Sequence, residues 1–222
     1  MRTRSPRRPK RRSGNPRWQR RPDARPEEIL VAALHVFGEH GFARARLEDV
    51  ARRAGVSKGT LYLYFPSKEE LFRAMVRARV VTTLAAAEQR IDAHSGTARE
   101  QLVSLAQSMW QTIRKDEMAR ISRLVQFELG NFPELARFYF QEVITRARRL
   151  VETILRRGIE AGEFRPVNAR FAARMLPSML VHSSQAQCFF AKFEPEPLTD
   201  EQIIDGVVDL YLNGVVATGK TD

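Results

Sequence analysis

Apolar residues recur at helical spacing almost without interruption from residue 26 to the C-terminal end, whereas the alternation typical of strands is scarce. This periodicity predicts an all-α fold of about nine helices. The 222 residues are 43% apolar, which is enough to build a core and argues against a wholly disordered protein. No apolar run approaches the roughly 18 residues that a bilayer span requires, so we expect a soluble protein with no membrane partner.

The first 25 residues form a segment of their own, rich in arginine and proline. Residues 1–26 hold eleven basic residues, one acidic residue and five of the eleven prolines, and so carry nearly all of the net charge of +11. Such a composition cannot repay its ordering entropy by burial, so we expect a disordered arm over residues 1–25. Three interpretations stay open: a solvated extension, a targeting peptide, and an arm that neutralises DNA phosphates.

Capping and breaking residues divide the next stretch into short helices. Pro26 suits a first helical position, and Gly41 ends that helix. A second short helix closes at Gly55, whose freedom at positive φ permits a sharp reversal. Ser57 is the next N-cap, and Pro66 ends a third helix of barely two turns. Two short helices joined by a tight glycine turn, behind a leading helix, are typical of a helix-turn-helix module.

The third helix has a face that its apolar anchor residues do not use. Leu61 and Phe65, four apart, form the buried pair. The outward residues suit base edges and phosphates in a major groove: Lys58, Gly59, Thr60, Leu63 and Tyr64, with Tyr62 toward one edge. Residues 27–66 are formally neutral, so a plain three-helix bundle stays open as an alternative on pattern alone.

One continuous string carries a resemblance to a known family. After Val50-Ala51 it reads Ala54-Gly55-Val56-Ser57-Lys58-Gly59-Thr60-Leu61-Tyr62-Leu63-Tyr64-Phe65-Pro66-Ser67-Lys68-Glu69-Glu70-Leu71. With Ala32-Ala33, Phe37 and Gly41-Phe42 of the leading helix, it resembles the TetR family of bacterial transcriptional regulators. The resemblance implies a homodimer with a DNA-binding domain at 26–80 (helix-turn-helix 46–65), an effector-binding and dimerisation domain at 81–217, and a tail at 218–222.

The resemblance also implies roles for individual residues. Ser57 would cap the recognition helix, Tyr62 and Tyr64 would reach phosphates, and Lys68 would contact a phosphate beside a helix N-terminus. Together with Arg46, the predicted DNA contacts are Ser57, Lys58, Gly59, Thr60, Tyr62, Tyr64 and Lys68. Arg46 departs from the family pattern, because the family usually has Thr or Ser there. The customary hydroxyl cap is therefore absent, and Arg46 is itself a candidate phosphate contact.

Five further helices are predicted from pattern in the rest of the chain. Apolar stripes mark a fifth helix over residues 102–113 and a sixth that ends at Gly130. A long seventh runs from Pro133 to Gly162, and Asn168 caps an eighth that is bent at Pro177. Thr199 and Gln202 have capping-box spacing and open the last helix.

The last helix is apolar over most of its circumference. A helix of this kind must be buried on more than one side, which in a terminal helix favours a partner subunit. The predicted dimer contacts are Ile203, Val207, Leu210 and Tyr211. A central helix within a single subunit stays open as the alternative.

An effector pocket is expected between helices five and eight, where the family has its pockets. Apolar cavities with few polar groups suit a largely apolar small molecule. The candidate lining residues are Trp110, Phe127, Phe138, Met175, Met179 and His182, each of which also fits an ordinary core position.

Enzymatic chemistry finds little support in the sequence. The four histidines (His35, His40, His94 and His182) are the candidates for a general base, and surface positions suit them better. His182 and Cys188 are six apart on one predicted helix and therefore do not converge as a dyad. The single cysteine excludes a disulfide framework and a four-thiolate site, and no phosphate loop, zinc spacing or cofactor motif is present. We therefore predict a protein that is not an enzyme and needs no metal or cofactor.

The sequence thus favours a homodimeric repressor in the bacterial cytoplasm, associated with the nucleoid, that binds double-stranded operator DNA and is released by a small effector. Two alternatives stay open. An activator of the same fold cannot be separated from a repressor, because the sign of control depends on where the operator lies. A sequence-tolerant nucleic-acid-binding protein could rely on the basic arm.

Overall fold

The computed structural model describes residues 25–93 and 96–215, and within them every regular element is helical. The predicted basic arm, apart from its last residue, and the predicted tail lie outside the described residues. Nine continuous helices are present in the described part, two of them interrupted by a wider π-helical turn. The all-α prediction of about nine helices is confirmed.

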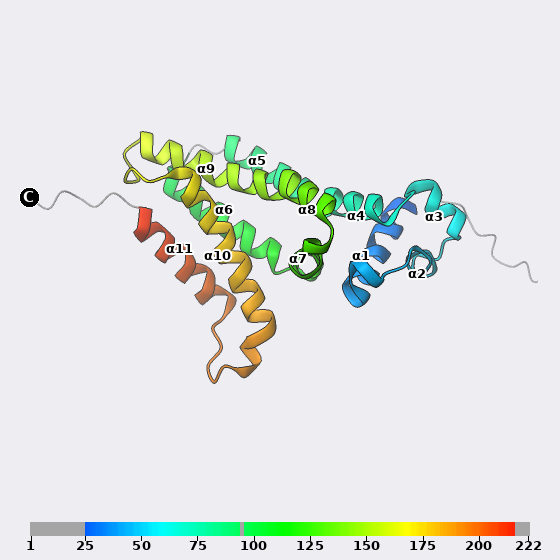
Figure 1. Ribbon diagram of the computed structural model, residues 1–222. Helices are drawn as coiled ribbons and strands as arrows, with labels where there is room; N and C mark the ends of the chain where they lie inside the picture. Colours follow the sequence, from blue (N-terminus) through cyan, green and yellow to red (C-terminus); the bar gives the residue numbers. More distant parts are fainter. Residues whose placement is uncertain (1–24, 94–95, 216–222) are drawn as a thin grey trace, which may run out of the picture.

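Three helices form a small head at one end of the molecule (Figure 1): α1 (Arg25–Arg44), α2 (Leu47–Arg53) and α3 (Lys58–Tyr64). Gly41 lies within α1 at φ 75° and ψ 161°, so the chain kinks there and continues for one more turn. Gly55 has φ 65° and makes the turn between α2 and α3, as predicted. Arg46 takes the N-cap position of α2 without a side-chain cap bond, which agrees with the missing hydroxyl.

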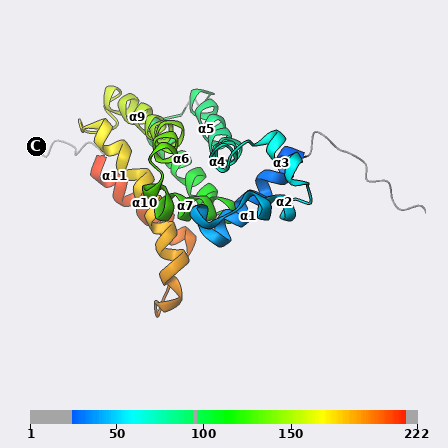
Figure 2. The same ribbon diagram turned by 45° about the vertical axis from the view of Figure 1, so that its right-hand side comes forward.

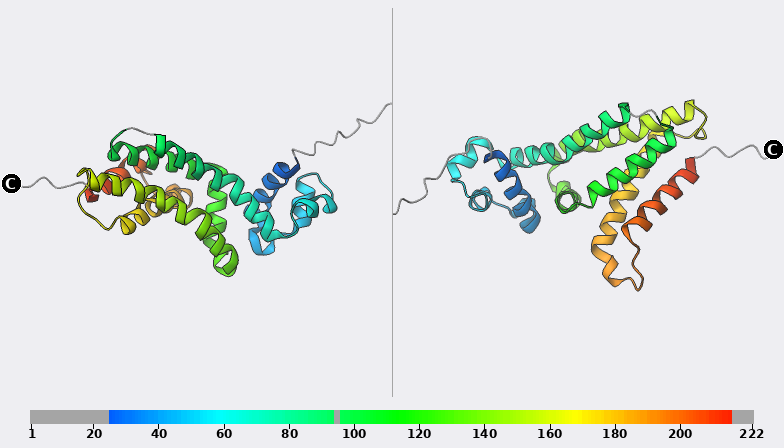
Figure 3. Two further views of the ribbon diagram at one scale, coloured as in Figure 1. Left: turned by 90° about the horizontal axis from the view of Figure 1, so that it is seen from above. Right: turned by 180° about the vertical axis from the view of Figure 1, so that it is seen from behind.

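A single long helix leaves the head and runs into the body. It comprises α4 (Lys68–Val76), the π-helical turn η2 (Arg77–Val81) and α5 (Thr82–Ala93), and Figure 3 shows it spanning the two parts. The Ser67 hydroxyl caps it by accepting from the Glu70 amide at 3.1 Å. The domain boundary predicted at residues 80/81 therefore falls inside one continuous helix.

The remaining helices build the body. They are α6 (Ala98–Ile113), α7 (Asp116–Glu128), α8 (Pro133–Tyr139) continued through η4 (Phe140–Ile144) into α9 (Thr145–Glu160), α10 (Ala169–Phe190) and α11 (Asp200–Val215). Short 3-10 turns follow α7 and α10: η3 (Leu129–Asn131) and η5 (Ala191–Phe193). Asn168 caps α10 by accepting from the Phe171 amide, and Thr199 and Gln202 form the predicted reciprocal cap of α11. α10 and α11 make an antiparallel hairpin whose tip projects beyond the other helices (Figure 2).

Buried apolar side chains form two clusters. The first includes the inner faces of α1–α4 but extends into α7, α8 and η4, through residues such as Ile121, Leu135 and Val143. The second joins α5, α6, α9, α10 and α11. The head therefore shares its core with α7 and α8, and the junction between the two clusters lies within the body.

Candidate nucleic-acid interface and ligand cavity

The two faces of α3 differ sharply in burial. Leu61 is fully buried and Phe65, just after the helix, is 8% exposed, so they anchor α3 on the head. On the other side Tyr62 is 40% exposed and Leu63 is 80% exposed. Lys58 and Gly59 are also exposed and Thr60 is half-buried. The predicted outward face of α3 is thus present as a surface, with Leu63 as its most exposed apolar side chain.

Local hydrogen bonds fix the start of α3. The Ser57 hydroxyl accepts from the Thr60 amide at 3.0 Å and lies 2.8 Å from the Thr60 hydroxyl. Gly59 has open space beside it, because a Cβ at this position would meet only the Ser57 hydroxyl, at 3.9 Å. The fold of the free protein therefore does not require glycine at position 59.

Lys58 reaches across the surface to α2. Its ammonium nitrogen lies 2.5 Å from Glu48 Oε1 and 5.7 Å from the centre of the Tyr62 ring. The hydrogen bond from Lys58 lowers the pKa of the Glu48 carboxyl and raises that of Lys58, so both groups stay charged at neutral pH. Since both side chains are about half exposed, the ammonium can exchange this carboxylate for another anion at little cost.

Lys68 faces the end of α1. Its ammonium donates to the carbonyl oxygens of Phe42 (2.6 Å), Ala43 (3.0 Å) and Ala45 (3.2 Å), and lies 4.7 Å from the Phe42 ring centre. These bonds use the three donors of an ammonium group. The predicted phosphate contact of Lys68 stays a prediction, and the structure adds a role in holding the α1–α2 corner. Tyr64 is half-buried against the head core, while Arg46 is exposed.

The same corner is held from the body. The Ala43 amide donates to Glu128 Oε2, at the end of α7, at 3.1 Å. A Cβ on Gly41 would collide with the same carboxylate. The Phe42 ring meets the edge of Phe132, which precedes α8, at 4.8 Å. Residues 41–45, which lead into the helix-turn-helix, are thus clamped between α4 on one side and α7 on the other.

A cavity of about 460 Å³ lies where the two apolar clusters meet. Both clusters contribute to its lining: the first through Val80, Ile121 and Val143, and the second through Ala87, Leu105 and Leu150. The other apolar lining residues come from α5, α6, α7, η4, α9 and α10: Leu84, Met109, Ile113, Met118, Val125, Ile144, Ala147, Pro177 and Val181. This volume falls in the usual range for small-molecule sites.

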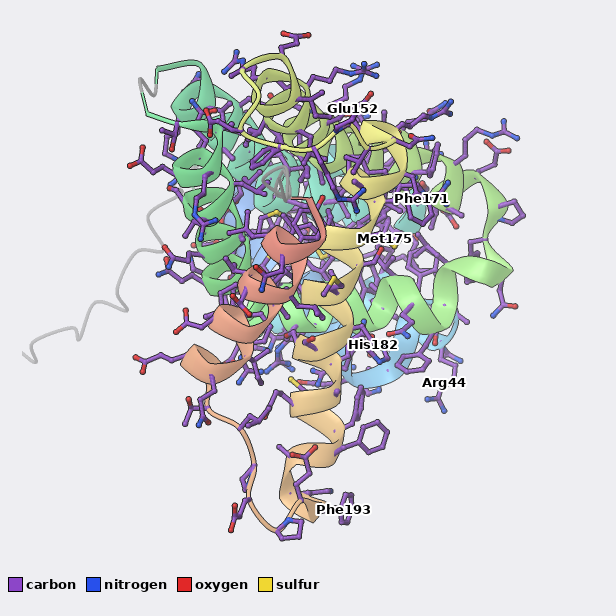
Figure 4. All side chains as sticks on the ribbon, turned by 90° about the vertical axis from the view of Figure 1, so that its left-hand side faces the viewer. Arg44, Glu152, Phe171, Met175, His182 and Phe193 are labelled. Atoms are coloured by element: carbon purple, nitrogen blue, oxygen red, sulfur yellow. The ribbon has the colours of Figure 1, made fainter. Side chains whose placement is uncertain are left out.

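The structure places the six predicted pocket residues in different surroundings. His182 lines the cavity, on an exposed face of α10. Trp110 and Phe138 are buried in the second and the first cluster, Met175 and Met179 pack against the second, and Phe127 is 64% exposed. Figure 4 shows Met175 and His182 along α10. The lining differs from the predicted set because large side chains fill the cores, whereas the cavity forms beside them.

The four predicted dimer residues also differ from one another. Ile203 and Tyr211 are buried in the protomer's own core, where the Tyr211 hydroxyl donates to the Ala172 carbonyl at 2.8 Å. Val207 is half-buried and Leu210 is 66% exposed. Six large apolar side chains along the α10–α11 hairpin are exposed: Phe171, Phe189, Phe190, Phe193, Leu198 and Leu210. Figure 4 shows Phe171 on α10 and Phe193 at the hairpin tip.

No group of histidine, cysteine or acidic side chains among the described residues is arranged to hold a metal ion. His35 is half-buried and His40 is exposed, while His94 lies outside the described residues. Within the described ranges, no helix has the length and apolarity to cross a membrane.

Comparison with known proteins agrees with this geometry. Residues 29–75 match the family model described as bacterial regulatory proteins, tetR family. Residues 100–214, more than half of the chain, match the C-terminal domain of AefR-like transcriptional repressors. The first match contains α2 and α3, and the second contains α7, α9 and α10, which line the cavity.

Individual relatives are regulators as well. The fatty acid metabolism regulator protein of Bacillus subtilis is 27% identical over 150 residues, covering 67% of this chain and 76% of its own. The transcriptional activator FasR of Mycolicibacterium smegmatis is 34% identical over 104 residues, covering 46% and 47%. The fold is similar to that of Bacillus subtilis FadR in complex with stearoyl-CoA, with a TM-score of 0.72, 23% identity, and 85% and 98% of the two chains covered. The chain belongs to the TetR family of bacterial regulatory proteins and is a DNA-binding transcription regulator with a helix-turn-helix.

Proposed function

We propose that the protein is a homodimeric repressor, not an enzyme, that holds an operator in the bacterial cytoplasm until a small effector enters the cavity between its two apolar clusters. The observation that carries this proposal is the position of the cavity. It lies against α7, and the end of α7 contacts the α1–α2 corner of the head. A ligand in the cavity can therefore change the orientation of α3 through α7.

The reading face of α3 combines small, polar and apolar groups. Thr60 offers a hydroxyl to a base edge or phosphate, and Gly59 lets the backbone approach the duplex closely. Leu63, 80% exposed, would contact a thymine methyl group. Lys58 would exchange Glu48 for a phosphate, because an exposed ion pair contributes little in water.

Dimerisation is proposed through the α10–α11 hairpin. Six large apolar side chains along this hairpin are exposed in the protomer, and contact with a second copy would remove them from water. Of the residues predicted from the sequence, Leu210 faces outward, whereas Ile203 and Tyr211 support α11 from within. A two-fold dimer would place two α3 helices in successive major grooves of a pseudo-palindromic operator.

The effector is proposed to carry a long apolar part. The similar FadR structure contains stearoyl-CoA, and the cavity here is lined mainly by apolar side chains. Met118, Ile121 and Val125 on α7 form part of this wall, and Glu128 follows within one further turn. A ligand that displaces α7 would also displace the carboxylate that holds Ala43, and α4 would follow through Lys68.

Binding to DNA tests the first half of this proposal. Fluorescence anisotropy would compare the full chain on an inverted repeat found beside its own gene and on random duplex at physiological salt. We expect a preference of at least about 10³-fold for the repeat, and a weakening of about tenfold in Thr60→Ala. Thr82→Ala, an exposed helical threonine far from α3, is the matched control. Equal binding to random duplex would favour the sequence-tolerant alternative.

That alternative relies on the basic arm, which lies outside the described residues. If the arm neutralises phosphates, deleting residues 1–24 should flatten the salt dependence of binding by about 0.9 in log–log slope for each phosphate that the arm neutralises. Operator and random duplex should then weaken to a similar extent. An unchanged slope would mean that the arm is a solvated extension that neutralises no DNA phosphates.

Glu128 tests the coupling. Dodecanoyl-CoA should lower operator affinity, and operator DNA should lower dodecanoyl-CoA affinity by the same factor, because binding free energies are reciprocal. Glu128→Ala should reduce this factor while leaving dodecanoyl-CoA affinity in the absence of DNA unchanged. Glu134→Ala, which removes an exposed carboxylate of α8, is the control. If Glu128→Ala leaves this factor unchanged, the contact at the end of α7 does not couple the cavity to the head.

A further inference from the structure

The charged residues that line the cavity are all basic. Among the described residues the lining contains three arginines, Arg90, Arg148 and Arg174, and no aspartate or glutamate. The remaining polar lining residues carry hydroxyl, amide or imidazole groups, among them Ser122, Gln126, Ser178, His182 and Gln185. A largely apolar site that gathers only cations is arranged for a ligand that is partly apolar and partly anionic.

Two of these arginines lie without a compensating carboxylate. Arg174, on α10, is exposed at the edge of the cavity, and no ion pair joins it to another described residue. Arg148, on α9, lies over the Phe140 ring at 5.7 Å, also without an ion pair among the described residues. By contrast, Arg146 is 2.5 Å from Glu88, two residues before Arg148 on the same helix. The third lining arginine, Arg90, donates to Ser108 at 2.9 Å.

Arg148 and Arg174 also act on each other. Partial burial lowers the pKa of the Arg148 guanidinium, and the positive charge of Arg174 lowers it further. Both groups nevertheless stay protonated at neutral pH, because an arginine side chain does not lose its proton in proteins. The free protein therefore holds two repelling cations beside an apolar cavity, an arrangement that costs stability and is typical of a binding site.

We propose that the cavity binds an amphiphile whose oxyanion headgroup lies between Arg148 and Arg174 while its apolar chain extends toward α6 and α7. This inference rests on the proposed effector site and specifies its ligand class. Guanidinium groups pair with carboxylate and phosphate oxygens in two-pronged geometry, so two of them can hold one such headgroup.

Neighbouring lining residues suit the same orientation. Tyr139, at the end of α8, lines the cavity, and burial raises the pKa of its phenol to about 12, so it stays a hydrogen-bond donor. The α6 and α7 walls present Leu105, Met109 and Ile121 to the apolar chain. Met side chains adapt to chains of irregular shape.

Calorimetry on the full-length protein without DNA tests the headgroup. Dodecanoate and dodecanoyl-CoA offer a carboxylate and phosphates respectively, and dodecan-1-ol has the same chain without charge. We expect at least one of the two anions to bind ten times or more tighter than the alcohol. Which anion does so identifies the headgroup. Equal affinity for all three compounds would overturn the proposal.

Substitutions locate the headgroup within the cavity. Arg148→Gln and Arg174→Gln should each weaken binding of the preferred anion at least tenfold and leave binding of dodecan-1-ol within twofold. Arg149→Gln and Arg170→Gln, exposed arginines on the same two helices outside the lining, should change neither affinity. Unchanged anion affinity in both cavity variants would place the headgroup elsewhere and overturn the proposal.

The melting temperature separates a binding role from a structural one. Because Arg174 repels Arg148 in the free protein, Arg174→Gln should raise the melting temperature without ligand by about 1–3 °C. A lower melting temperature together with equal weakening of alcohol and anion binding would show that Arg174 only supports the fold, and would overturn the proposal.

Operator binding is measured separately. A protein that binds the anion through both arginines but no operator would refute the repressor function and leave the ligand class standing.

Discussion

The head and the body are both packed from helices, but they differ in how completely their side chains fill the space between the helices. The head has a closely packed aromatic core, whereas the body contains a large cavity beside its own core. The fully buried Phe42 ring of the head packs against Phe37 of α1, Phe72 of α4 and Phe132 before α8, with ring centres 4.8–5.6 Å from its own. In the body, a cavity of about 460 Å³ remains at the junction with that dense core. Close packing fixes the pose of a reading surface, whereas a cavity leaves helices free to settle differently around a ligand.

The largest expected effect tests whether the body is closely packed away from the cavity. Gly158 of α9 lies so near Phe164 and Ala98 that a Cβ would be 2.9 Å from the Ala98 Cβ and closer still to the ring. Gly158→Ala should therefore lower the free energy of unfolding by about 2–3 kcal/mol, measured by urea denaturation. Gly206→Ala, with open space on α11, is the control. A neutral Gly158→Ala would mean that the whole body is loosely packed.

The second prediction concerns the filled head. Lys68→Met removes three charge-assisted hydrogen bonds to the α1–α2 corner and the interaction of the ammonium with the Phe42 ring. Unfolding free energy should fall by about 2 kcal/mol, with operator affinity falling as well. Lys115→Met, an exposed lysine before α7, should stay within about 0.5 kcal/mol. Weaker operator binding at unchanged stability would instead assign Lys68 to phosphate alone.

The third prediction separates the surface of the head from its core. Gly59→Ala should leave the fold as stable as before or slightly more stable, because the space beside Gly59 is open. Operator affinity should fall about tenfold, or 1.4 kcal/mol, since the added methyl group holds α3 away from the duplex. Thermal unfolding and anisotropy measure the two quantities. Undiminished affinity would show that α3 does not approach DNA closely at this residue.

The smallest expected effect returns to the body, at an ion pair between α5 and α9. Arg146 hydrogen-bonds Glu88 and lowers the pKa of that carboxyl below its ordinary 4.5. The stabilisation is therefore complete above pH 4.5 and is lost as the pH falls below it. Because Glu88 is partly exposed, the loss should be under about 1 kcal/mol. Urea midpoints of the protein and Glu88→Gln should converge in acid; a constant difference would contradict this.

Sequence reasoning succeeds best where local rules determine the structure. Ser57, Gly55 and Pro66 define α3 through capping, positive φ and the missing amide of proline, and each acts within a few residues. The outward and inward faces of α3 then follow from the helical period. The ion pair of Lys58 with Glu48 was missed because it joins two helices whose angle the sequence does not state.

The cavity shows where such reasoning ends. Its walls come from α5, α6, α7, η4, α9 and α10, and it exists because side chains from these helices fail to meet. Choosing large side chains on the correct helices therefore selects core residues such as Trp110 and Phe138, since bulk favours burial. The charges carry a better signal: Arg174 lies in a mainly apolar stretch of α10 and has no acidic residue three or four positions away.

The two π-helical turns lie where the halves of the molecule meet. η2 and η4 pack against each other at the level of the cavity, and each accommodates one residue more than a regular helical turn would. Deleting one residue from Arg77–Val81 would remove the wider turn while the turns on either side keep their orientation. Deleting one residue from the regular turns of α4 would instead rotate everything before it by about 100° about the helix axis and draw it about 1.5 Å toward the body. The orientation of the head relative to the body thus depends on the number of residues in the regular turns that join them, and an insertion or deletion in those turns would re-aim α3 while its own sequence stays the same.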